Sequence, residues 1–194
     1  MSARSDILAR LARAKPAVPR DYLAKPDNFT EQPNCDPLVR FTELAEAASS
    51  TVTHVADWAV VPQVTATYLH DHGLAAEAFL AAEAPLAATD WEAAGISLVR
   101  PPLSADGCVL IGDSLGAVAE NGTVVVSSAG QQAISDVFLA QTHIVLLRRG
   151  RIFVGLADLW AALRAEAGEC FMPREFCLVS GPSRTADLGV PAKM

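Results

Sequence analysis

The sequence predicts an α/β protein, a three-layer sandwich with a mostly parallel sheet, and three observations support this fold class. Apolar runs typical of strands alternate with helix-period segments across the second half of the chain. The chain has 194 residues, of which 51% are hydrophobic, and this suits one domain with a full core. Finally, an Asn-Gly pair at 121–122 separates two β-like runs, which is a strong hairpin signal.

The first 36 residues are expected to form a helix and an arm ahead of that domain. Residues 5–15, SDILARLARAK, place Ile7, Leu8 and Leu11 on one face of a helix that carries three basic side chains elsewhere. From residue 16 to residue 37 the chain contains five prolines, which exclude regular structure and favour an extended arm. We therefore expect an amphipathic helix and extended arm over 1–36, and a single α/β domain over 37–194.

The elements of the domain are predicted from periodicity in chain order. In the first half we expect helices over 38–48 and 58–72 and strands over 52–55 and 96–99, whereas 76–81 is ambiguous. In the second half we expect a strand over 108–111, the hairpin, a helix over 131–139, a buried strand over 143–147, a helix over 156–167 and a last strand over 176–180. The hairpin turn is predicted to be type I′, with positive φ at Asn121 and Gly122.

Charge and hydropathy exclude several classes of function. Fifteen Lys and Arg against twenty-two Asp and Glu give a formal net charge of -7, which would repel a nucleic-acid backbone. Apolar runs such as 144–147 are too short to cross a bilayer, and the charged N-terminus lacks the apolar core of a signal peptide. We expect a cytoplasmic protein that binds neither nucleic acid nor membrane.

The cysteines and histidines predict no metal site and no cofactor. Cys35, Cys108, Cys170 and Cys177 show no Cys-x-x-Cys spacing, so reduced structural thiols are the favoured interpretation. The run His-Asp-His at 70–72 fits a helix C-terminus better than a metal site, because residues two apart do not share a helix face.

Two motifs offer nucleophiles. The run GDSLG at 112–116 fits Gly-x-Ser-x-Gly, which would make Ser114 the nucleophile of an esterase, although a hairpin follows where a helix is required. The run AENG at 119–122 puts Glu120 directly before a tight turn. A glutamate so placed acts as a covalent nucleophile or general base, and the competing interpretation is an exposed hairpin shoulder.

The run SGPSRT at 180–185 has the composition of an anion-binding turn after a strand. Gly181 permits close approach, Ser183 and Thr185 offer hydroxyls, and Arg184 offers a bidentate fork for a carboxylate or phosphate. The competing interpretation is a solvated C-terminal turn. Because ligands gather at strand ends in α/β sheets, we expect Glu120 to approach this turn.

Together these stretches resemble the lactate-utilisation protein C (LutC/YkgG) family, the proteins of the LUD domain. The resemblance lies in ILARLARA near the N-terminus, AVAENGTVVVSS, THIVLL at 142–147 and, most specifically, SGPSRTAD. It implies the fold of the sugar-phosphate isomerases and coenzyme A transferases (NagB/RpiA/CoA transferase-like). The chain departs from the family pattern at Leu115, where the family has an aspartate.

The resemblance implies an accessory role in oxidising L-lactate to pyruvate, beside partner subunits that carry the iron–sulfur ligands. The chain itself would bind a small anionic ligand and would need no cofactor of its own. The first alternative is a stand-alone sugar-phosphate or acyl-coenzyme A enzyme that uses Glu120, and the second is the Ser114 esterase. The sequence alone leaves open whether the chain is an enzyme. The expected ligand-binding residues are Asn121, Gly122, Thr123, Ser180, Gly181, Ser183, Arg184, Thr185 and Asp187.

Overall fold

The computed structural model describes residues 3–14, 35–81, 86–99, 107–128, 133–168 and 171–181. The chain divides into two compact units, Met1–Gln32 and Pro33–Met194. Within the described ranges, no helix is both long enough and apolar enough to cross a membrane.

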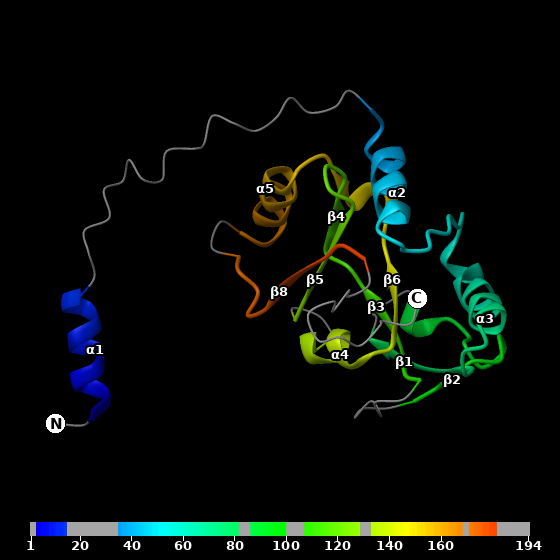
Figure 1. Cartoon of the computed structure of the whole chain (residues 1–194), viewed down its shortest axis with the longest axis horizontal. Coiled ribbons are helices and arrows are strands. Elements are labelled where there is room, and N and C mark those ends of the chain that lie inside the picture. The colour runs from blue at the N-terminus through cyan, green and yellow to red at the C-terminus, as the bar shows by residue number, and fades with distance from the viewer. Residues whose placement is uncertain are drawn as a thin grey trace, which may run out of the picture. The chain divides into compact units, whose positions relative to one another are not determined.

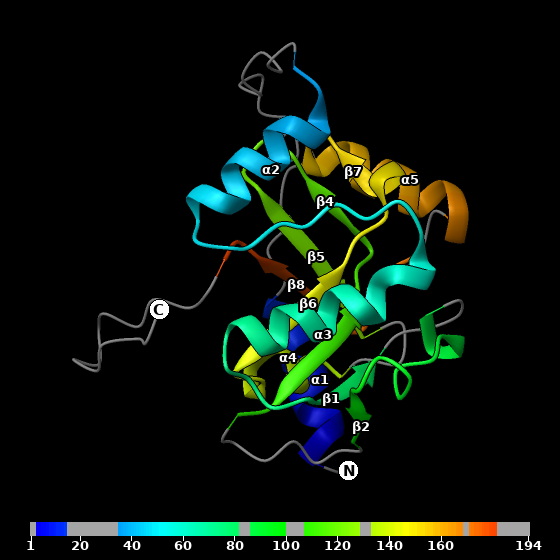
Figure 2. The same cartoon turned by 90° about the vertical axis from the view of Figure 1, so that its right-hand side faces the viewer.

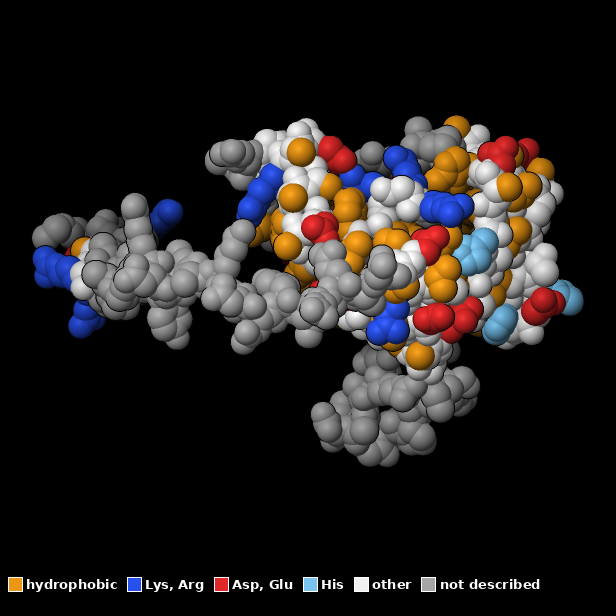
Figure 3. Space-filling model, turned by 90° about the horizontal axis from the view of Figure 1, so that it is seen from above, with side chains coloured by type: hydrophobic (Ala, Val, Ile, Leu, Met, Phe, Trp, Pro, Cys, Tyr) orange, Lys and Arg blue, Asp and Glu red, His pale blue; other side chains and the backbone are white. Residues whose placement is uncertain are grey.

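The first unit contains one described helix, α1 (Ala3–Ala14), which confirms the helix predicted over 5–15. Arg4, Arg10 and Arg13 are exposed on it, and Figure 3 shows basic side chains projecting from this helix. The apolar side chain of Ile7 is 58% exposed. An exposed apolar side chain on a helix of this kind is typical of an element that does not belong to a deep core.

Deleting residues 1–30 is therefore expected to leave the melting temperature of the domain within a few degrees of the intact chain. Loss of about 1 kcal/mol shifts the melting temperature of a domain of this size by only a few degrees. Thermal unfolding of the truncated and intact chains, followed by circular dichroism, measures the difference. A drop of more than roughly 10 °C would make the helix an integral part of the fold.

In the second unit, four strands form a parallel sheet, sheet A, in the order β2-β1-β3-β6. The strands are β1 (Glu77–Ala81), β2 (Ser97–Leu98), β3 (Val109–Asp113) and β6 (Thr142–Leu146). Val109, Leu110 and Ile111 of β3 are at most 1% exposed. Such a continuous apolar run is typical of a parallel strand that is covered on both faces.

Four further strands form sheet B, in the order β7-β4-β5-β8. They are β4 (Gly116–Val118), β5 (Thr123–Ser127), β7 (Ile152–Phe153) and β8 (Phe176–Val179). The β4–β5 and β5–β8 pairs are antiparallel, while β4 and β7 are parallel. The chain passes directly from β3 of sheet A into β4 of sheet B (Figure 1).

The helices of this unit cover the two sheets (Figure 2). They are α2 (Pro37–Ala47), α3 (Val61–Asp71), α4 (Ile134–Leu139) and α5 (Leu156–Ala167), with single 3₁₀ turns at Trp58–Val60, Leu86–Ala88 and Arg149–Arg151. Successive residues of β4 point to opposite faces of sheet B. Ala117 packs with α2 residues on one face, and Val118 packs with α5 residues on the other. Sheet B is thus the middle of a helix–sheet–helix sandwich.

Local signals in the sequence set the helix ends. The side chain of Asp36 accepts a hydrogen bond from the backbone N–H of Leu38 at 2.9 Å, and Pro37 occupies the first turn of α2. Helix α5 is followed by Gly168, whose φ is +96°. The helices predicted over 38–48 and 156–167 are confirmed.

The α/β class and the parallel sheet are confirmed, and three details differ from expectation. Residues 52–55 form no strand. The half-buried side chain of Val52 packs instead against a cluster that includes Phe41 and Ala45 of α2. The ambiguous segment 76–81 contains β1. The split into two sheets was not predicted, because it depends on which strands pair and not on which segments are strands.

Candidate functional site

The turn that carries Glu120 joins β4 to β5 with four residues, 119–122, between the paired Val118 and Thr123. The hairpin is confirmed, but the type I′ turn is wrong. Gly122 has φ +67°, whereas Ser49 is the one non-glycine residue with positive φ among those described, so Asn121 is not left-handed. Four-residue hairpin loops are built most often around a type I turn.

Gly122 is required here for two reasons. Its φ is in the left-handed region that disfavours side chains. In addition, a Cβ at this position would lie 2.7 Å from Leu44 Cβ and 2.9 Å from the backbone nitrogen of Ala45. The turn therefore packs directly on the C-terminal half of α2.

Thr123 and Ser180 bring the two sequence motifs together. The β5–β8 pairing places Val124 opposite Val179, so the next residues outward, Thr123 and Ser180, are neighbours at the same sheet end. Their hydroxyl oxygens are 2.6 Å apart in a hydrogen bond. Thr123 is 1% exposed, whereas Ser180 is exposed. Strand pairing thus brings Thr123, which follows the AENG turn, beside Ser180, the first residue of the SGPSRT run, at one end of sheet B.

Gly181 lies against the C-terminal end of α2. It has φ +91°, and a Cβ there would lie 2.5 Å from the carbonyl oxygen of Ala48. Because the carbonyl end of a helix carries negative partial charge, an anion beside Gly181 needs a cation to offset it. Ser183, Arg184, Thr185 and Asp187, the other predicted residues of this turn, lie outside the described residues.

Glu120 is exposed and is held at the start of α5. Its backbone N–H donates to the carbonyl of Val154 at 3.0 Å. Its Oε2 lies 3.3 Å from the point where a Cβ on Gly155 would be, and Asp158 Oδ2 lies 3.7 Å from the same point. Asp158 accepts a hydrogen bond from the N–H of Gly155 at 3.1 Å.

The neighbours of Glu120 were not predicted from the sequence. Gly155 is the N-cap of α5 and Asp158 is its third residue, a spacing that marks a helix start in the sequence. That spacing predicts where α5 begins. It does not indicate that Glu120, thirty-five residues before Gly155, is a neighbour of this helix start. Only the β4–β7 pairing brings Gly155 to Glu120.

Ser114 lacks the surroundings of an esterase nucleophile. Its hydroxyl donates to the backbone carbonyl of Leu146 at 3.0 Å. Strand β4 begins two residues later, at Gly116, where a nucleophile elbow requires a helix. Residue His143 pairs with Leu110 on β3, three residue pairs from the Asp113–Leu146 pair that precedes Ser114. His143 is therefore out of reach as a base for Ser114, since strands rise about 3.3 Å per residue.

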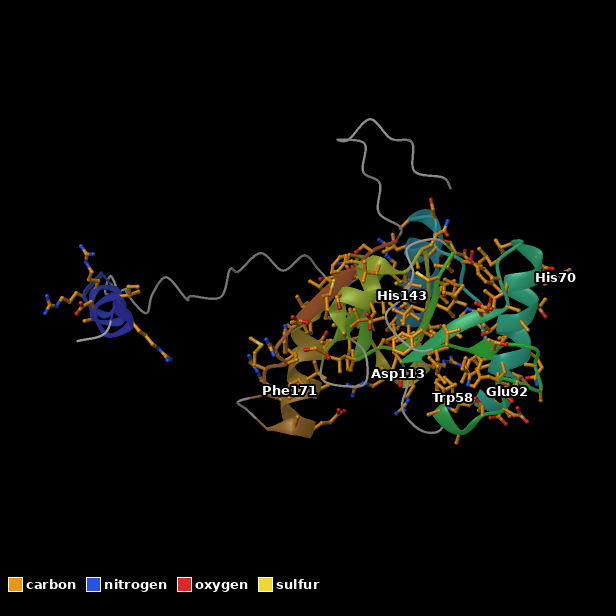
Figure 4. The ribbon with its side chains drawn as sticks, turned by 90° about the horizontal axis from the view of Figure 1, so that it is seen from below. Trp58, His70, Glu92, Asp113, His143 and Phe171 are labelled. Atoms are coloured by element: carbon orange, nitrogen blue, oxygen red, sulfur yellow. The ribbon has the colours of Figure 1, made fainter. Side chains whose placement is uncertain are left out.

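The His-Asp-His run ends helix α3, as predicted. His70 Nδ1 is 3.2 Å from Asp71 Oδ1, and His72 Nδ1 is 2.9 Å from the carbonyl of Tyr68. Figure 4 shows His70 on the outer side of α3. Over the described ranges, the structure contains no group of three or more His, Cys, Asp or Glu side chains arranged to hold a metal ion.

His143, in contrast, lies among the strands (Figure 4), and burial lowers its pKa to about 4 from the ordinary 6.5. The folded protein then binds fewer protons than the unfolded chain between these two values, so stability rises with pH across that window. As the pH falls from 7 to 5, His143 takes up a proton in the unfolded chain but not in the folded protein. We expect this difference to lower the free energy of unfolding by about 2 kcal/mol.

Urea unfolding of the wild type and of His143→Gln at the two pH values measures this contribution. The variant should lose that part of the pH dependence, whereas His54→Gln, at an exposed histidine, should keep it. An unchanged pH dependence in His143→Gln would contradict the prediction.

Comparisons with known proteins agree with this architecture. A crystal structure of a DUF162 family protein from Deinococcus radiodurans matches the fold with a TM-score of 0.58 and 21% sequence identity, over 75% of this chain and 87% of that chain. No curated protein matches the chain significantly. The family model of the LUD domain matches residues 38–191, which include both sheets and both candidate segments. The chain therefore belongs to the LUD domain family.

Proposed function

We propose that this protein is a LutC-like accessory component of L-lactate utilisation in the cytoplasm. It would serve the oxidation of L-lactate to pyruvate beside iron–sulfur partner subunits, and its own part would be to bind a small anionic ligand. Membership of the LUD domain family is consistent with an association with lactate utilisation. The observation that carries the ligand proposal is the 2.6 Å contact between Thr123 and Ser180, because it joins the two segments with ligand-binding chemistry.

Arg184 is proposed as the cation of this site. It follows Gly181 by three residues in the sequence, and three residues of chain reach at most about 11 Å, at up to about 3.6 Å per residue. Ser183 and Thr185 would add hydroxyl donors, and Asp187 lies on the same segment. A bidentate arginine offsets both the ligand charge and the negative partial charge of the α2 carbonyl end.

The proposed role is tested by growth on L-lactate. A host strain that lacks its own protein of this family should recover growth when it expresses this chain with the neighbouring genes. The same strain grown on a sugar controls for toxicity. Failure to restore growth, with the protein present in the soluble extract, would contradict the proposed role.

Replacing Arg184 by lysine is expected to weaken anion binding although the charge is kept. A point ammonium cannot reproduce bidentate geometry. Loss of the charge-assisted pair in Arg184→Ala should cost about 1.5–3 kcal/mol, or roughly ten- to a hundredfold in affinity. Calorimetry with L-lactate, phosphate, sugar phosphates and coenzyme A measures these affinities.

Arg174→Ala is the matched control, because Arg174 is an exposed arginine before β8. It should bind every ligand as the wild type does. If Arg184→Ala also keeps the wild-type affinity for every ligand, the 180–185 segment is a solvated turn.

A second candidate function is a stand-alone enzyme for an acyl-coenzyme A or a sugar phosphate. The placement of Glu120 favours it, because its backbone N–H bonds to the carbonyl of Val154 and its exposed carboxylate lies beside Gly155 at the start of α5. Incubation with an acyl-coenzyme A, followed by trapping and mass spectrometry, should then find a glutamyl thioester on Glu120. Absence of the adduct in wild type, as in Glu120→Gln, would contradict an acyl-coenzyme A enzyme that uses Glu120.

A further inference from the structure

Strand β8 has a free edge. It stands last in the strand order of sheet B, where β5 pairs with one side of it, and no described strand pairs with the other side. The strand consists of Phe176, Cys177, Leu178 and Val179, so it contains neither a charge nor a proline. Soluble proteins protect a free edge with charged side chains, prolines or bulges, or cover it, because the edge is a template for another strand. The edge of β8 therefore requires a cover.

The pairing with β5 determines which backbone groups face the free edge. The N–H of Ser128, next to the end of β5, donates to the carbonyl of Glu175, next to the start of β8, at 3.2 Å. In an antiparallel pair, residues that bond to the partner strand alternate with residues that bond away from it. Cys177 therefore bonds toward β5, whereas Phe176 and Leu178 turn their N–H and C=O groups to the free edge.

The side chains of β8 leave an apolar surface beside the same edge. Leu178 pairs with Val125, which packs in the cluster with α5, so Leu178 and Phe176 belong to the α5 face of sheet B. The ring of Phe176 stacks on Trp160 of α5, with the ring centroids 4.6 Å apart. Leu178, in contrast, is 49% exposed. Helix α5 thus covers the first of these two side chains and leaves the second one open.

We propose that β8 pairs with the β8 strand of a second copy of this chain, antiparallel and about a two-fold axis, so that sheet B continues through the dimer. This dimer goes beyond the proposed function and does not depend on it. Opposed residues of an antiparallel pair point to the same face of a sheet, so Phe176 and Leu178 must meet residues at the same two positions. Their free N–H and C=O groups would then bond to those of the other strand.

The surroundings of β8 determine the register. Gly181, with φ +91°, interrupts the extended backbone just after the strand, whereas the hydrogen bonds with β5 continue before it. A pairing centred on Cys177 covers 175–179 and uses this extended part. It sets Phe176 opposite Leu178 of the partner subunit, so each exposed leucine gains an aromatic neighbour. It also sets Cys177 opposite Cys177 of the partner subunit.

Closure and charge favour a second copy as the occupant of this edge. A strand that pairs with its own copy gives a closed two-fold dimer, in which neither β8 edge is left free. Glu175, the acidic residue next to the strand, would lie opposite Val179 of the partner subunit. No like charges are then opposed along the strand pair.

The dimer is expected to be weak and to become tighter with added salt. A short strand pair supplies only part of the about 1,200–2,000 Å² that stable interfaces bury, so we expect a Kd on the order of micromolar. Each chain carries a formal net charge of -7, and salt screens the repulsion between the two copies.

Light scattering of the full chain after size exclusion, at about 1–500 µM protein, tests the association. Wild type should shift from monomer to dimer as its concentration rises. Leu178→Lys should stay monomeric, because a charge on a free edge opposes pairing. Leu98→Lys is the matched control, since Leu98 is 44% exposed on β2, an edge strand of sheet A, and this variant should associate as the wild type does. A monomer at every concentration, or equal association of Leu178→Lys and wild type, would overturn the inference.

A disulfide tests the register. Opposed residues of a non-hydrogen-bonded pair have Cα atoms about 4.5 Å apart, a distance that a disulfide spans. In a chain with Cys35, Cys108 and Cys170 replaced by serine, the thiol oxidant diamide should therefore join Cys177 to Cys177 of the partner subunit. Non-reducing electrophoresis detects the product, which should be lost when Leu178→Lys is added. Absence of this product, at a concentration where the same chain is dimeric, would show that another surface forms the dimer.

Discussion

Replacing Trp91 by alanine is expected to lower the free energy of unfolding by about 3–5 kcal/mol. Trp91 is 2% exposed and belongs to the core cluster that joins α3 to sheet A. Its indole Nε1 also donates a hydrogen bond to the carbonyl of Leu86 at 3.0 Å. The alanine variant loses the packing, leaves a cavity and removes one of three donors to the Leu86 carbonyl, the other two being the backbone N–H and the hydroxyl of Thr89.

Trp91→Phe is the matched control, because it keeps an aromatic ring and removes the hydrogen bond. Its loss should be smaller, about 1–3 kcal/mol. Guanidinium unfolding followed by far-ultraviolet circular dichroism measures both variants without depending on tryptophan fluorescence. A loss below about 1 kcal/mol in Trp91→Ala would mean that this cluster is not the core of the domain.

Replacing Gly122 by alanine should lower the free energy of unfolding by about 2–5 kcal/mol. The left-handed backbone accounts for about 1–2 kcal/mol. The new Cβ would also lie 2.7–2.9 Å from atoms of Leu44 and Ala45, two of them backbone, which cannot move as freely as a side-chain tip. Forced overpacking of this kind adds about 1–3 kcal/mol.

Gly73→Ala separates the two causes. Gly73 has φ +62°, close to the +67° of Gly122, but no atom lies within 4 Å of its Cβ position. In Gly73→Ala, the free energy of unfolding should therefore fall only by the cost of the left-handed backbone, about 1–2 kcal/mol. Equal losses in the two variants, measured by the same unfolding experiment, would show that the contact with α2 has no energetic weight.

The glycines change how the motifs are interpreted. Gly122 and Gly181 both belong to segments that resemble ligand-binding motifs, and both pack against α2 at distances that exclude a Cβ. Close packing is therefore a sufficient reason for glycine at each position. Glu120, whose side chain is exposed, is the residue of the AENG turn for which packing supplies no such reason.

The sequence by itself determined the type of most elements in the domain. Helix α5 and strand β8 carry strong periodicity and clear end signals, and the structure has them over Leu156–Ala167 and Phe176–Val179. The Asn-Gly pair predicted the hairpin correctly. These are local properties, because a few neighbouring residues decide backbone preference and which face is apolar.

The tertiary structure alone decided how these elements assemble. Strand partners are far apart in the chain, so no local pattern indicates that β4 and β7 pair in a second sheet. That pairing brings Gly155 to Glu120, and the packing of α2 on sheet B brings Leu44 to Gly122. The need for glycine at position 122 also depends on this contact, since α2 leaves no space for a side chain there.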